Sequence, residues 1–141
     1  MKAKAFLQQL KKIDALIKNK RIERDMLWDV ATNTVATMHG ERVKSSGNPQ
    51  RMASASDARI DLEREIDECI ARLTATRRDV IEVIEQLNAT EYDLLHKIYV
   101  QHILMCDVAQ IIDKSYSWVT TVHGRALKHV QNILDARENN Q

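Results

Sequence analysis

The sequence contains few of the residues that make turns. Among 141 residues there are three glycines and one proline, and aromatic residues make up only 4%. Sandwiches and barrels need many short turns, so this composition argues against them. Most of the chain consists of Leu, Ile, Val, Ala, Lys, Arg, Glu and Gln, which are mostly good helix formers. The composition therefore predicts an all-α fold.

A strong charge imbalance, long apolar runs and a cysteine framework are also missing. Twenty-one Lys and Arg stand against 20 Asp and Glu, a formal net charge of +1, which excludes a globally basic nucleic-acid scaffold. No apolar run reaches 18 residues, and Lys11 and Lys12 interrupt any signal-like segment, so we expect a cytoplasmic protein with no membrane partner. Cys69 and Cys106 are too few for a disulfide framework, and we expect both to be small core residues.

Catalytic and metal-binding patterns are not evident. His96 and His102 are six residues apart, as are His123 and His129, whereas a metal pair on one helix needs a spacing of three or four. There is no phosphate-binding glycine loop and no glycine-flanked serine. The sequence predicts a protein that is not an enzyme and uses no cofactor or metal.

Residues 1–87 predict a long antiparallel hairpin of two helices, a coiled coil. The first helix, to about residue 35, has apolar side chains at helical spacing, and residues 39–50 form the main loop because they contain two glycines and the proline. The second helix runs from about Ser54 to Leu87. The expected apolar positions are Phe6, Leu10, Ile13, Ile17, Met26 and Val30 in the first helix, and Ile66, Ile70, Leu73, Val80, Ile84 and Leu87 in the second, with Arg77 at one further seam position.

Both apolar faces are narrow, so the hairpin is predicted to need another copy, most simply as a dimer. The alternative is that the hairpin forms half of a monomeric bundle with the C-terminal helices. Residues 88–141 are predicted to form a separate domain.

This second domain is predicted to contain three helices. Asn88 and Glu91 have the spacing of a capping box, in which Glu91 reaches back to the backbone. A helix of about a dozen residues follows, which buries Leu94, Leu95, Ile98 and Tyr99. A short helix covers about 105–112, a turn covers 113–115, and a longer helix runs from Tyr116 to about Ala136.

The last two helices have the layout of a helix-turn-helix, whose second helix enters the DNA major groove. Ser115 can cap the second helix, and Asp113 can adopt the left-handed conformation that such a turn needs. The expected core positions are Val108, Ala109, Ile112, Val119, Val122 and Ala126, continued along the last helix by Val130 and Ile133.

The outward face of the last helix supplies the candidate DNA contacts. Short hydroxyl side chains can hydrogen-bond base edges, and cations near them can hold phosphates without reading sequence. Trp118 lies between the buried and outward faces, where it either braces the packing or contacts a phosphate. The predicted base contacts are Tyr116, Ser117, Thr120 and Thr121, and the predicted phosphate contacts are Lys114, Trp118, Arg125 and Lys128.

The positive charge is local. Residues 114–129 contain three Lys or Arg and no acidic residue, and residues 1–24 contain eight Lys or Arg and two acidic residues. Lys2, Lys4, Lys11 and Lys12 either approach the same DNA or form a solvated face. Residues 57–68 are rich in Asp and Glu. They form either a solvated acidic face or a docking surface for a basic partner such as RNA polymerase.

The segment Leu104–Leu127 resembles region 4 of the sigma-70 family. The resemblance rests on Asp107-Val108-Ala109, Ser115, Val119 and Arg125-Ala126-Leu127, and it covers roughly residues 87–134. Asp113 stands where region 4 commonly has glycine, and Gly124 lies inside the expected recognition helix. No sequence resembling the other regions of a sigma factor is present.

With its hairpin, the loop Gly40–Asn48 and the segment Lys114–Val119, nearly the whole chain resembles small phage and prophage proteins of Gram-positive bacteria. These are the late-gene transcriptional regulators of the RinA and ArpU type. The resemblance implies a phage protein that binds double-stranded DNA in a bacterial host cell and controls transcription, with a possible contact to RNA polymerase.

Two other functions fit the same features. A DNA-packaging protein similar to a terminase small subunit also combines a helix-turn-helix with oligomerising helices. An adaptor would use the region 4-like surface to bind polymerase without touching DNA.

Overall fold

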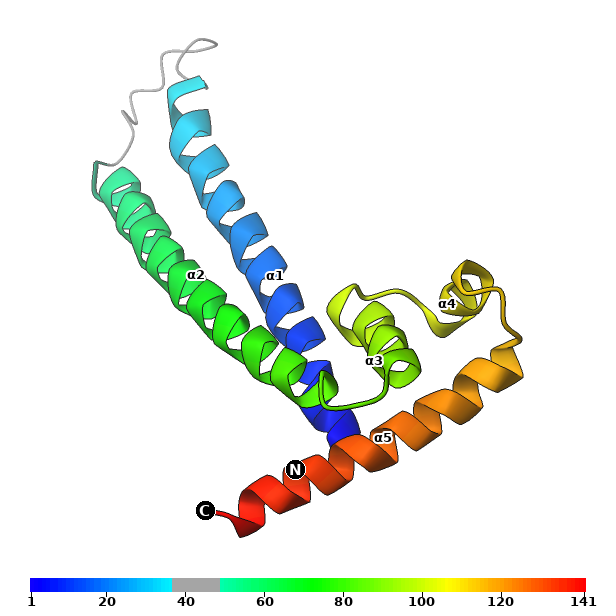
Figure 1. The fold of residues 1–141 in the computed structure, drawn as a ribbon. Helices are drawn as coiled ribbons and strands as arrows, with labels where there is room; N and C mark the ends of the chain where they lie inside the picture. Colours follow the sequence, from blue (N-terminus) through cyan, green and yellow to red (C-terminus); the bar gives the residue numbers. More distant parts are fainter. Residues whose placement is uncertain (37–48) are drawn as a thin grey trace. The chain divides into compact units, whose positions relative to one another are not determined.

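The computed structural model describes residues 1–36 and 49–141, and throughout this part of the chain the regular structure is helical. The all-α prediction is therefore confirmed (Figure 1). No helix in the described part is long and apolar enough to cross a membrane. The elements are α1 (Ala3–Ala36), α2 (Pro49–Ile84), α3 (Ala89–Leu95), the π-helix η2 (His96–Val100), α4 (Met105–Ile111) and α5 (Tyr116–Asn139).

The second long helix starts earlier than predicted. It begins at Pro49, whereas the sequence suggested a start near Ser54 and placed residues 49 and 50 in the main loop. Proline is well suited to the first turn of a helix, because its fixed φ is helical and its missing N–H would have no partner there. The rest of that predicted loop, residues 39–48, lies outside the described residues.

The contacts divide the chain into two compact units. The head unit consists of residues 1–13 and 73–141, and the two-helix unit consists of residues 14–72. The start of α1 and the end of α2 therefore belong to the same unit as the C-terminal helices. The predicted functional division between residues 87 and 88 stays a prediction.

In the two-helix unit, α1 and α2 run in opposite directions. Lys20 Nζ of α1 lies 2.6 Å from Glu65 Oε2 of α2. The guanidinium of Arg59 lies over the ring of Trp28, 4.1 Å from its centroid. Since the later residue of α1 pairs with the earlier residue of α2, the two helices are antiparallel here.

The buried face of α2 is rotated from the predicted seam. Leu73 and Val80 are buried as expected, but Ile70 is 36% exposed and Arg77 is also exposed. Cys69 takes the place predicted for Ile70, and the half-buried Thr76 takes that of Arg77. This rotation leaves the Arg77 guanidinium in water, which avoids the large cost of burying an unpaired charge.

The apolar face of α1 also differs from the prediction beyond Ile17, which is buried. Met26 is 62% exposed and Val30 is 42% exposed, whereas Arg24 and Leu27 are half-buried. Met26 follows Ile17 by about two and a half helical turns, so it lies on the opposite side of α1. The apolar residues after Ile17 therefore lie on a different side of α1, and the prediction that Met26 and Val30 belong to its buried face was wrong.

In the head unit, α3 and α4 pack against α5 (Figure 1). The start of α1 and the end of α2 contribute Leu7, Leu10, Val83 and Ile84, which are almost fully buried. Arg137 Nη1 of α5 lies 2.8 Å from Asp79 Oδ1 of α2. This packing supports the helices that carry the candidate site.

The predicted dozen-residue helix after Asn88 is divided into two parts. It begins as α3 and changes to the π-helix η2, which ends at Val100. His102 then adopts a left-handed backbone conformation, with φ of 59°. Short π segments and left-handed non-glycine residues are both more frequent at functional sites than elsewhere.

Candidate nucleic-acid interface

The connection between α4 and α5 is fixed by backbone hydrogen bonds. The amide of Lys114 donates to the carbonyl of Ala109 at 3.0 Å, and the amide of Asp113 donates to the carbonyl of Gln110 at 3.3 Å. Asp113 has φ of 54°. This combination is the Schellman ending of a helix, with Asp113 in the left-handed position that glycine usually occupies. The expected role of Asp113 is confirmed.

The start of α5 is capped as predicted. Ser115 has an extended backbone, and its Oγ accepts a hydrogen bond from the amide of Trp118 at 3.0 Å. Such a cap satisfies one of the amide groups that a helix leaves without an internal partner at its N-terminus. The cap holds the first turn of α5, where the candidate base contacts lie.

Beneath the connection lies a small apolar core. Val108, Ala109, Val119 and Val122 are buried together with Leu94 of α3. Ile112 packs against this cluster and is partly buried. Ala126 and Val130 are also buried, but the last buried position is Leu134 instead of the predicted Ile133, which is half-buried. A well-packed base of this kind holds α5 in place relative to α3 and α4.

The candidate base contacts lie mainly in solvent. Tyr116 is 56% exposed, Ser117 and Thr121 are exposed, and Thr120 is half-buried. Both threonine hydroxyls donate to the carbonyl of Ser117, each at 2.9 Å. Because these bonds use the hydroxyl hydrogens, each oxygen keeps its lone pairs available to accept a hydrogen bond.

The three basic candidates are also exposed: Lys114, Arg125 and Lys128. By helical spacing, Ser117, Thr121 and Lys128 share one face of α5, and Gly124 lies between them. Gly124 is exposed, and a β-carbon added there would meet no atom within 4 Å. This face therefore combines hydroxyl groups, a cation and a position without a side chain.

Trp118 braces the packing. Its side chain is partly buried against the Val119 cluster, and Lys114 Nζ lies 5.4 Å from the centroid of its ring. The ammonium group and the ring face can attract each other at this distance. Of the two roles considered for Trp118, the packing role is thus seen directly, and it positions Lys114.

Two hollows adjoin Trp118, and both include residues that the sequence did not single out. One, of about 270 Å³, is lined by Asp93, Lys114 and Trp118 among others. The other, of about 520 Å³, is lined by Thr90, Thr121 and Arg125 among others. The start of α3 therefore borders the candidate interface. The capping pattern at Asn88 predicted where α3 begins, but it did not predict that the start of α3 lies beside Trp118.

Glu91 does not complete a capping box. Asn88 Oδ1 accepts from the amide of Glu91 at 2.9 Å, as predicted, but the Glu91 carboxylate turns inward instead of toward the backbone. It is 1% exposed, and its Oε2 lies 2.8 Å from His129 Nδ1 of α5. Glu91 Oε1 has no hydrogen-bond partner among the described residues. The pairing with His129 links α3 to α5 across 38 positions of sequence, which no local pattern reveals.

The other histidines and cysteines differ in environment. His123 is half-buried, and its Nε2 lies within hydrogen-bonding distance of the Tyr99 hydroxyl. Cys69 is buried as expected, whereas Cys106 is exposed. Within the described ranges, no group of three or more His, Cys, Asp or Glu is placed to hold a metal ion.

Comparisons with family models, with curated proteins and with solved structures found no match to this chain. The function is therefore inferred from the geometry of the segment from α3 to α5.

Proposed function

We propose that this chain is a sequence-specific DNA-binding protein that regulates transcription in the manner of small phage regulators. In this proposal α4 and α5 act as a helix-turn-helix, and α5 enters the major groove. The observation that carries the proposal is the face of α5 formed by Ser117, Thr121, Gly124 and Lys128. It is exposed over two to three helical turns, and a packed core supports the helix from behind.

The dimensions of this element suit a groove. The major groove of B-DNA, about 12 Å wide, admits one α-helix. Side chains on the inward face of such a helix must be short for the backbone to come close. Ser117, Thr121 and Gly124 satisfy this requirement.

The hydroxyl geometry suggests which bases are read. Because Thr120 and Thr121 donate to the carbonyl of Ser117, their oxygens accept hydrogen bonds from a partner. In the major groove the donors are the amino groups of adenine and cytosine. We therefore infer that these threonines favour adenine or cytosine at the bases they contact.

The basic side chains position the helix. Lys114, Arg125 and Lys128 are assigned to phosphates, and Thr90 of α3 lines the same hollow beside Trp118 as Arg125. Because so few cations are involved, one copy would bind weakly at physiological salt, since phosphate contacts supply much of the affinity. Two linked copies bind more tightly through avidity.

We also propose that two copies associate through the side of α1 that is opposite α2. On this side Ile22 is 57% exposed and Met26 is 62% exposed, and the two lie one helical turn apart, so their side chains form a continuous apolar surface. Lys18 and Glu23 flank them five residues apart, the spacing that pairs opposite charges between parallel coiled-coil helices. A second copy would cover Ile22 and Met26 and place Lys18 near the partner's Glu23.

Selection of genomic DNA fragments bound by the full chain, followed by sequencing, tests the proposed function. Enrichment of a promoter or operator sequence is the expected result. Enrichment of a packaging site would instead assign the chain to DNA packaging. No enrichment, together with RNA polymerase that co-purifies with the chain, would replace the proposal with a polymerase-binding adaptor.

A further inference from the structure

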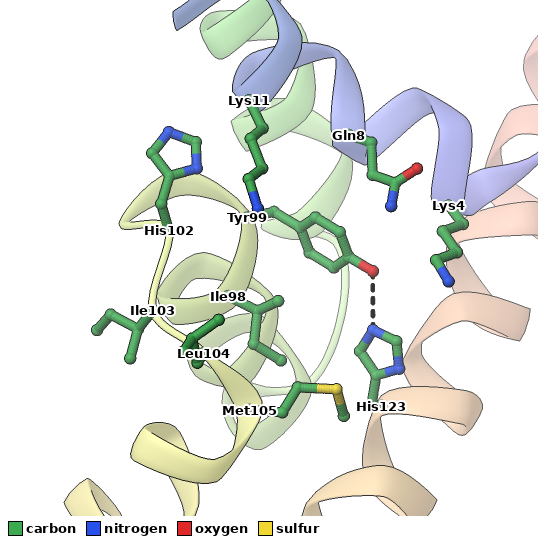
Figure 2. A pocket seen from close by; sticks show the side chains of 10 residues that line it. All are labelled: Lys4, Gln8, Lys11, Ile98, Tyr99, His102, Ile103, Leu104, Met105 and His123. Carbon is green, nitrogen blue, oxygen red and sulfur yellow. Dashed lines mark hydrogen bonds between the residues drawn. The ribbon is translucent and has the colours of Figure 1, made fainter. Parts of the chain in front are cut away.

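A further hollow lies in the head unit, bordered by the start of α1 and by a different side of α5. It has a volume of about 230 Å³, and Figure 2 shows the side chains around it. The lining residues come from α1, η2, the segment before α4, α4 and α5. They are Lys4, Gln8, Lys11, Ile98, Tyr99, His102, Ile103, Leu104, Met105 and His123.

The wall formed by α1 is cationic. Lys4, Gln8 and Lys11 are separated by four and three residues, so they lie along one face of α1. In Figure 2 the three side chains extend toward Tyr99 and His123. None of the ten lining residues is acidic, so the lining itself supplies no negative charge to balance Lys4 and Lys11.

The opposite wall is apolar. Ile98 and Met105 are half-buried and pack against the core beneath the α4–α5 connection. Leu104 is 63% exposed at the edge of the hollow. Exposed leucine next to half-buried apolar side chains offers a surface that a small apolar group can cover.

A neutral polar pair lies between these walls. The hydroxyl of Tyr99 lies 2.8 Å from His123 Nε2, and Tyr99 is 8% exposed. Burial lowers the pKa of His123, and the charge of Lys4 lowers it further. Burial raises the pKa of Tyr99, so both groups are uncharged at neutral pH and neither offsets the lysines.

We propose that this pocket binds a small organic carboxylate with a short apolar body. Lys4 and Lys11 hold the carboxylate, and the apolar body lies against Ile98, Leu104 and Met105. A purely inorganic anion would leave the apolar wall in water, and a neutral apolar molecule would leave the lysines without a counter-charge. Both halves of the ligand are therefore needed. The site does not depend on DNA recognition, although His123 belongs to the helix proposed to read DNA.

Titration of the full chain with hexanoate, followed by calorimetry and by NMR of the His123 ring, tests the proposal. We expect saturable binding of one hexanoate per chain, and at least tenfold weaker binding of 1-hexanol and of inorganic phosphate. A carboxylate beside Lys4 would also raise the pKa of His123, because it offsets the lysine charge. Absence of saturable hexanoate binding would overturn the proposal.

Two pairs of substitutions locate the site. Lys4→Gln with Lys11→Gln should weaken hexanoate binding at least tenfold while the circular dichroism spectrum and the melting temperature stay unchanged. Arg72→Gln with Arg77→Gln removes the same charge outside the pocket and should leave binding unchanged. Equal weakening by both pairs, or phosphate binding as tight as hexanoate binding, would contradict a carboxylate site. Neither result depends on whether the chain binds DNA.

Discussion

Asp113 occupies a backbone conformation that costs energy for any residue with a β-carbon. Its φ of 54° ends α4, and the hydrogen bonds around it leave little freedom to relax. Asp is among the residues that tolerate this conformation best, which explains why the connection forms without glycine.

Asp113→Gly should therefore stabilise the protein, by about 0.5–1 kcal/mol, because glycine adopts positive φ without a steric penalty. Chemical denaturation of the variant measures the gain in the free energy of unfolding. Asp113→Ala is the matched control and should destabilise the protein. A glycine variant less stable than the original would show that the Asp113 side chain has a role beyond its conformation.

Glu91 is the one charged side chain buried among the described residues, and His129 supplies its hydrogen bond. His129→Ala should destabilise the protein by about 1–3 kcal/mol, because it leaves a buried carboxylate without that partner. Adding Glu91→Met to His129→Ala should recover part of this loss, since the double variant has no buried charge to satisfy. Thermal unfolding of the original chain, His129→Ala and the double variant gives the comparison. A double variant no more stable than His129→Ala would contradict this account of the pair.

Contacts between residues close in sequence could be predicted, whereas contacts between distant residues could not. The Ser115 cap and the Asp113 turn were predicted because both depend on neighbours within a few positions. The bonds from Glu91 to His129 and from Tyr99 to His123 were missed, because they join residues 38 and 24 positions apart. Only the packing of α3 and η2 against α5 creates them.

At the scale of elements, α5 combines a buried face with a face proposed to contact DNA. Helical periodicity identified the buried face correctly as far as Val130. The buried faces of the long helices α1 and α2 were harder to predict. Their apolar residues fit two adjacent seams, and only the partner helix decides that Cys69 is buried while Ile70 is exposed.

At Gly124 of α5, one substitution tests both the stability of the helix and its contact with DNA. Gly124→Ala should stabilise α5 by about 1 kcal/mol, because glycine is a poor helix former and the added methyl group meets no neighbour. The same substitution should weaken DNA binding, since the methyl group projects from the proposed contact face. Thermal unfolding and fluorescence anisotropy with a selected DNA site measure the two effects. Higher stability with unchanged affinity would remove Gly124 from the interface.

At the scale of the whole molecule, the proposed association depends on the exposed apolar side of α1. Ile22→Glu with Met26→Glu should convert a dimer into a monomer in light scattering at micromolar concentration, because the added charges cannot be buried in the contact. Ile60→Glu is the control, since Ile60 is similarly exposed on α2 and outside this face. A wild-type chain that is already monomeric would contradict the proposal.

The proposed mode of DNA binding involves the whole molecule, because affinity comes from all bound phosphates together. Each phosphate contact adds about 0.9 to the slope of log affinity against log salt concentration. Arg125 and Lys128 are both exposed on α5, whereas Arg72 and Arg77 are exposed on α2. These two pairs allow the same change of charge to be made inside and outside the proposed interface.

The salt dependence of DNA affinity, measured with a selected site, decides whether α5 holds the DNA. Arg125→Ala with Lys128→Ala should reduce the slope by about 1.8 per bound copy, while Arg72→Ala with Arg77→Ala should leave it nearly unchanged. If the α5 pair leaves both the slope and the affinity unchanged, α5 does not hold the DNA and the proposed interface is wrong.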